Sequence, residues 1–107
     1  MPTNVCIDVD LTVVDEKGEL LSGVSEALVR LRQANCRLTL WSAAGAEYAK
    51  SVAVKHGLEV FFEGFAGKPD IAIDDEPEST QPRVVFPFNA DTQWGEITEE
   101  ILQKCRE

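Results

Sequence analysis

Two aspartates lie one residue apart near the start of the chain, where a run of apolar residues ends. Asp8 and Asp10 follow Val5-Cys6-Ile7, a segment with the composition of a buried β-strand. Alternate residues of a strand point to the same side, so the two carboxylates are expected to lie close together. Such carboxylates repel each other unless a cation lies between them or one of them holds a proton. The spacing therefore predicts a metal ion or an acid–base pair at the end of this strand.

Further polar residues follow other apolar runs in the same way. Ser42 comes directly after residues 36–41, and Asp74 and Asp75 come after residues 71–73. In a parallel sheet the carboxyl ends of all strands lie at one edge, and ligands bind at that edge. The polar side chains are therefore expected to converge there on one site.

The elements that must position these residues are apolar runs that alternate with helical patterns, which favours a parallel sheet flanked by helices. Strands are predicted at 4–9, 36–41, 58–62, 71–73 and 83–86, and helices at about 23–35, 43–57 and 94–106. A small hairpin is predicted around residues 16–18, because a glycine there separates two short extended pieces. The fold class that follows is α/β, with a mostly parallel five-stranded sheet.

Length and composition favour a single globular domain, predicted to span residues 1–107. The sequence has no run of about 18 apolar residues, so we expect no membrane span. It has no basic segment followed by a long apolar one, so we expect no signal peptide. The three cysteines lie far apart, which favours reduced thiols and a cytoplasmic protein. Because the net charge is -9 and no basic face is evident, nucleic acid is not expected as a binding partner.

Four short motifs, taken in chain order, resemble those of the haloacid-dehalogenase-like hydrolases. They are Ile7-Asp8-Val9-Asp10-Leu11-Thr12, Leu40-Trp41-Ser42, Lys68 and Ile73-Asp74-Asp75. The resemblance covers most of the chain. Most members of that family are magnesium-dependent phosphatases, which implies a phosphorylated substrate and Mg²⁺ as cofactor. The resemblance also implies a Rossmann-like three-layer sandwich of the very short kind that has no cap domain.

The resemblance implies a role in phosphoryl transfer for four motif residues and for Ala43, which follows the second motif. Asp8 would attack phosphorus and form an aspartyl-phosphate, and Asp10 would act as general acid and base. Ser42 and the backbone amide of Ala43 would bind phosphoryl oxygens. Lys68 would neutralise the charge of the nucleophile and the phosphate.

The resemblance also implies which groups would hold Mg²⁺. The ligands would be Asp8, the backbone carbonyl of Asp10 and one of Asp74 and Asp75, with water completing an octahedron. Only short segments separate the motifs, so no cap domain covers them. The site is therefore expected to be open to a large substrate, or to be covered by a second copy of the chain.

Two features depart from the family pattern. Leu11 stands where many members have glycine. Lys68 precedes Asp74 by six positions, and an extended strand over that interval would be ~20 Å long, more than a lysine side chain spans. Either the chain doubles back between these residues, or Lys68 does not reach the site.

Two other kinds of protein share parts of this pattern. A receiver-type phospho-acceptor domain has a similar length, but its acceptor aspartate follows the third strand, where this chain has Phe62-Glu63-Gly64. A relative of the hydrolases that has lost catalysis would serve as a binding module. No residue pattern marks the substrate as a sugar, a nucleotide, a lipid or a protein.

Overall fold

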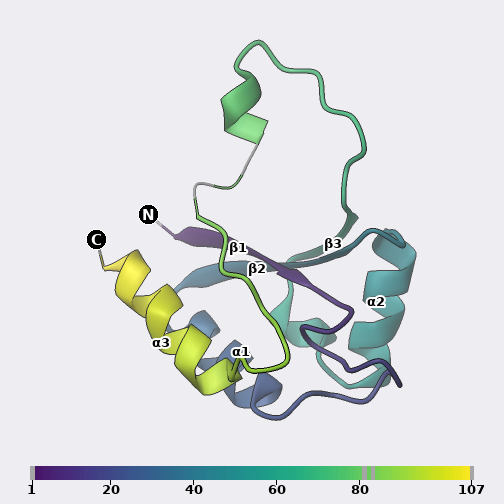
Figure 1. Cartoon of the computed structure of the whole chain (residues 1–107), viewed down its shortest axis with the longest axis vertical. Coiled ribbons are helices and arrows are strands. Elements are labelled where there is room, and N and C mark those ends of the chain that lie inside the picture. The colour runs from purple at the N-terminus through teal and green to yellow at the C-terminus, as the bar shows by residue number, and fades with distance from the viewer. Residues whose placement is uncertain (1, 81, 83, 107) are drawn as a thin grey trace.

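The computed structural model describes residues 2–80, 82 and 84–106, and consists of a parallel sheet with three helices on one side of it (Figure 1). In chain order the elements are β1 Thr3–Asp8, α1 Val24–Gln33, β2 Cys36–Ser42, α2 Ala46–Lys55, β3 Gly64–Gly67 and α3 Trp94–Cys105. Two 3₁₀ turns, η1 Glu59–Phe61 and η2 Pro77–Thr80, lie between them. The α/β class is therefore confirmed. None of the helices in the described part of the chain is long and apolar enough to cross a membrane.

The sheet has the order β1-β2-β3, and both pairs of strands are parallel. The register sets Asp8 opposite Trp41 and Ser42 opposite Gly67. The carboxyl ends of the three strands therefore lie side by side. Asp8, Ser42 and the residue that follows Gly67 share one edge of the sheet, as the sequence predicts for the first two.

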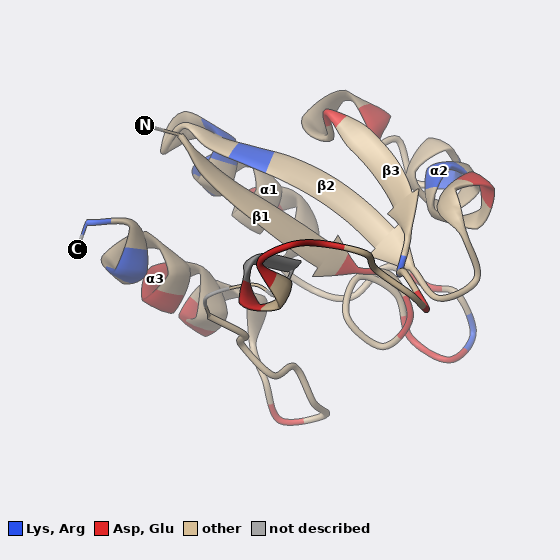
Figure 2. Cartoon of the chain, turned by 90° about the horizontal axis from the view of Figure 1, so that it is seen from above, with Lys and Arg blue, Asp and Glu red and all other residues tan. Residues whose placement is uncertain are grey.

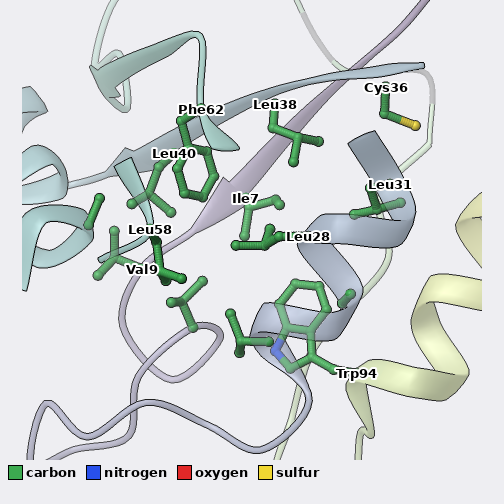
Figure 3. Packing of buried hydrophobic residues seen from close by; sticks show 14 of the residues in the cluster. Ile7, Val9, Leu28, Leu31, Cys36, Leu38, Leu40, Leu58, Phe62 and Trp94 are labelled. Carbon is green, nitrogen blue, oxygen red and sulfur yellow. The ribbon is translucent and has the colours of Figure 1, made fainter. Parts of the chain in front are cut away.

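Alternate residues of β2 point into a single core on the helical side of the sheet. Cys36, Leu38, Leu40 and Ser42 are buried, whereas Arg37 between them is exposed. The helices supply half of the same cluster (Figure 3): Val24, Ala27, Leu28 and Leu31 from α1, Ala49 and Ala53 from α2, and Trp94, Ile97 and Ile101 from α3. The remaining members come from β1, the turn after it and the residues beside η1: Ile7, Val9, Val13, Val14, Leu58 and Phe62. The described elements thus form two layers, a sheet and its helices, in place of the predicted three-layer sandwich.

The predicted strand at residues 58–62 is wrong. Gly57 follows α2 with φ +69°, and Leu58 and Phe62 are buried on either side of the turn η1. The third strand comes later, at β3. An apolar run of this length is compatible with a strand or with a buried turn. The two buried residues, Leu58 and Phe62, are four positions apart, which is the spacing of a helical turn.

Two further predicted strands, at residues 71–73 and 83–86, form no strand in the described part of the chain, and residue 83 lies outside that part. The connection from β3 to α3 is instead a long loop. Its first part lies on the side of the sheet away from the helices, and its last part returns to the start of α3 (Figures 1 and 2). Ile73 is 97% exposed there. A three-residue apolar run next to the acidic residues 74–76 offers few hydrogen bonds, and like charges extend a chain. The described sheet therefore has three strands and not five.

The predicted hairpin is present as a tight turn after β1. Asp15 Oδ1 accepts the backbone N–H groups of Lys17 and Glu19 at 2.8 and 3.0 Å. Gly18 completes the turn with φ +79°, a conformation that glycine adopts without strain. This turn lies at the same end of the sheet as Asp8.

Candidate active site

A compact turn at the end of β1 carries the two aspartates. The carbonyl of Val9, a fully buried residue, accepts the backbone N–H of Val13 at 2.9 Å. Leu11 has φ +61°, a conformation that favours glycine, and its side chain is exposed. With Val9 anchored in the core, Asp8 before it is half-buried and Asp10 after it is exposed. The turn therefore presents both carboxyl groups at the surface.

The C-terminal helix supports this turn. Trp94, the first residue of α3, is 4% exposed and donates from Nε1 to the backbone carbonyl of Thr12 at 2.7 Å. The ring of Phe88 packs on the indole with 5.2 Å between ring centres. An element at the far end of the chain thus fixes the backbone beside the aspartates.

Lys68 reaches Asp8 across the sheet. β3 ends at Gly67, opposite Ser42, and the Lys68 N–H donates to the carbonyl of Ser42 at 3.0 Å. From this position Lys68 Nζ lies 3.2 Å from Asp8 Oδ1 and 5.7 Å from the centre of the Trp41 ring. The lysine follows a strand of the sheet directly, so it reaches the aspartate at the strand ends without the chain doubling back.

Tyr48, in the first turns of α2, binds the second aspartate. Its hydroxyl donates to Asp10 Oδ1 at 2.6 Å. This hydrogen bond, followed by partial burial and the charges of Asp10 and Asp8, raises the pKa of the Tyr48 phenol above its usual value. The sequence prediction missed Tyr48, although a tyrosine early in a helix that begins at the same edge of the sheet was a signal.

Ser42 closes the turn between β2 and α2. It is 2% exposed, and its Oγ accepts the backbone N–H of Ala44 at 3.0 Å. The helix begins at Ala46, not at Ala43 as predicted, so Ala43 is an exposed turn residue before the helix. Both residues lie at the predicted edge, but Ala43 is not an amide of the first helical turn.

Asp74 and Asp75 lie in the long loop between β3 and α3. Both are exposed, and Asp74 Oδ1 accepts the backbone N–H of Glu76 at 2.9 Å. Among the described residues, no group of three or more histidine, cysteine, aspartate and glutamate side chains is placed to hold a metal ion. Asp8 and Asp10 offer the oxygen donors that Mg²⁺ prefers, but in the described part of the chain no third carboxylate joins them to form such a group. As placed, the residues do not fit a magnesium ion.

Comparison with known proteins does not assign the chain to a family. No protein-family model matches the chain, and no curated protein matches it significantly. The resemblance to the haloacid-dehalogenase-like hydrolases therefore rests on the four motifs alone.

Proposed function

We propose that the chain is a phosphatase that hydrolyses phosphomonoesters through an aspartyl-phosphate on Asp8. The observation that carries the proposal is the 3.2 Å approach of Lys68 Nζ to Asp8 Oδ1 at the carboxyl edge of the sheet. A carboxylate nucleophile and the phosphoryl group that it attacks are both anionic, so they need a cation beside them. Lys68 meets that need from the position that follows β3, where its backbone N–H binds the carbonyl of Ser42.

In this reaction the Asp8 carboxylate attacks phosphorus, and the bond from phosphorus to the ester oxygen breaks. Asp10 gives its proton to the departing oxygen. Asp10 then takes a proton from a water molecule, which attacks the aspartyl-phosphate and releases phosphate and the Asp8 carboxylate. Lys68 stabilises the charge on the phosphoryl oxygens, and the Tyr48 hydroxyl holds the Asp10 side chain in place.

Magnesium stays a prediction of the resemblance. Because the described residues as placed do not complete its ligand set, the positive charge in this scheme comes from Lys68. The five-stranded sheet predicted from the sequence would change the ligand set. In that sheet Asp74 would end a parallel strand at the same edge as Asp8. This would require a rearrangement of β3, because the two residues between Lys68 and Ile71 are too few to cross from β3 to the far side of β1.

Hydrolysis of p-nitrophenyl phosphate, with Mg²⁺ and with a chelator, tests the proposal. Asp8→Asn should lower turnover by about 1,000-fold or more, because the amide is a poor nucleophile. Lys68→Ala should lower it by about 100-fold through loss of the positive charge. Asp91→Asn and Lys50→Ala are matched controls, since both residues are exposed outside the site, and should keep full activity.

Three outcomes would count against this function. Full activity in Asp8→Asn would remove Asp8 as the nucleophile. No turnover of a broad panel of phosphate esters, with or without Mg²⁺, would exclude a phosphatase. Binding of inorganic phosphate without any turnover would favour the binding module in its place.

A further inference from the structure

Two of the three cysteines meet at the end of the core remote from the aspartates. Cys36 is the first residue of β2 and is 2% exposed, and Cys105 is the last residue of α3 and is half-buried. Cys105 packs against the cluster that contains Cys36, and it lies near enough to that thiol to raise its pKa. Figure 3 shows the Cys36 sulfur turned toward the margin of this cluster.

The helix that carries Cys105 is fixed at several points along its length. Trp94 binds the carbonyl of Thr12 at its start, and Ile97 and Ile101 are buried further along. Glu99, on its outer side, forms an ion pair with Arg30 of α1. The contact between the two thiols is therefore set by the docking of the whole helix.

We propose that Cys36 and Cys105 form a reversible disulfide by exchange with a low-molecular-mass disulfide such as oxidised glutathione. The Cys105 thiolate attacks one sulfur of glutathione disulfide and releases one glutathione thiol. The Cys36 thiolate then attacks the Cys105 sulfur of this mixed disulfide and releases the second. The protein loses two electrons and two protons, and the reagent gains them as two thiols.

Accessibility sets the order of the two steps. The half-buried Cys105 is open to the reagent, whereas Cys36 is enclosed. Burial, followed by the neighbouring Cys105, raises the pKa of Cys36 to about 11, so this thiol is protonated at neutral pH and the closing step becomes faster as pH rises. Cys6 lies on the exposed face of β1, away from the core, and so serves as an internal control.

The bond would tie the C-terminal helix covalently to the start of β2. Because the same helix supports the turn beside the aspartates through Trp94, the bond also keeps that support in place when the chain end frays. The inference does not depend on the proposed phosphatase activity, and its test needs no substrate.

The test equilibrates the folded protein in mixtures of reduced and oxidised glutathione, followed by alkylation and peptide mapping by mass spectrometry. We expect one peptide pair joined through Cys36 and Cys105, with Cys6 still alkylated. The oxidised protein should also show a midpoint of thermal unfolding roughly 10 °C higher than the reduced protein. A glutathione adduct that stays on Cys105, or a disulfide that includes Cys6, would overturn the proposal.

Variants and unfolding provide the controls. Cys6→Ser should oxidise as the wild type does, and Cys105→Ser should show neither the joined peptides nor the higher midpoint. Cys105 ends a helix and is partly exposed, so its replacement tests the pairing even if Cys36→Ala does not fold. In urea the selectivity should disappear, since an unfolded chain favours the shorter loop between Cys6 and Cys36. Equal selectivity in the folded and unfolded protein would contradict pairing by the fold.

Discussion

At the scale of single residues, the pair Asp8–Lys68 is better placed for chemistry than for stability. Its side chains are 36% and 40% exposed, and ion pairs of that exposure contribute about 0–1 kcal/mol to folding. The pair Arg37–Glu63, at 3.1 Å, is similarly exposed and contains neither aspartate of the site. Loss of either pair should therefore lower the free energy of unfolding by a similarly small amount in a denaturation experiment. Of these two pairs, only Asp8–Lys68 places a cation beside a candidate nucleophile.

Tyr48 gives a direct measurement of the second aspartate, because it is the only tyrosine of the chain. Its hydrogen bond to Asp10 raises the pKa of the phenol, so phenolate absorbance should rise at a higher pH than in the urea-unfolded protein. Asp10→Ala removes the acceptor and its charge, and should move the pKa back toward the ordinary value of about 10. Asp91→Ala is the control that should leave the titration unchanged.

The same shift determines how stability depends on pH at the alkaline end. The folded pKa lies above the unfolded one, so the folded protein holds the phenolic proton to higher pH. The resulting stabilisation is fully present below the unfolded pKa of about 10 and is lost as pH rises through the folded pKa. Identical titrations of wild type and Asp10→Ala would show that the hydrogen bond is absent in solution.

At the scale of the elements, α3 is tied to the turn after β1 by one buried hydrogen bond. Trp94→Phe keeps an aromatic ring but removes the Nε1 donor to the Thr12 carbonyl. We expect the free energy of unfolding to fall by about 1–3 kcal/mol, because the carbonyl loses its partner in a partly buried place. Urea denaturation measures the change. Trp41→Phe is the matched control, since the Trp41 ring is half-buried at the surface of the sheet, and a Trp94 variant as stable as this control would contradict the bracing role.

The strands β1 and β2 could be predicted from the sequence, because each is a run of apolar, strand-forming residues that ends in a polar residue. The ends of α1 and α2 follow from Asn35 and Gly57, whose positive φ angles of 65° and 69° stop a helix. The strand at 58–62 could not be excluded from the sequence, since a short apolar run is also compatible with a buried turn. The composition of residues 71–73 favours a strand, but composition alone does not determine whether they pair with another strand or with which one.

For the site, the residues at strand ends could be predicted and those from other elements could not. Asp8 and Ser42 lie where the two first strands end, which the parallel arrangement fixes. Lys68 depends on the register of β3, and that register is set by pairing with Ser42, not by any local pattern. Tyr48 depends on how α2 sits over the end of β1, which only the tertiary packing determines.

At the scale of the whole molecule, the negative charges of the long loop and of the aspartates at the end of β1 determine how closely the loop can approach the sheet. In the described sheet β1 has a partner strand on one side only, and exposed strand edges tend to accept further strands. The apolar residues 71–73 follow Lys68 too closely to reach that edge as a parallel strand, but the acidic residues 74–76 of the loop (Figure 2) can fold back toward Asp8 and Asp10. Within a chain of net charge -9, that approach is opposed by repulsion.

A divalent cation would offset this repulsion, so Mg²⁺ is expected to bring the acidic residues 74–76 of the loop toward Asp8 and Asp10. Amide hydrogen exchange of residues 71–76 and of the turn after β1 should slow in Mg²⁺ and stay fast in NaCl of equal ionic strength. Asp8→Asn and Asp74→Asn should each remove the effect, while Asp91→Asn should retain it. Unchanged exchange at saturating Mg²⁺ would mean that the loop does not approach the aspartates and that Lys68 alone supplies the positive charge. The measurement needs no substrate, so it separates the question of the metal from that of catalysis.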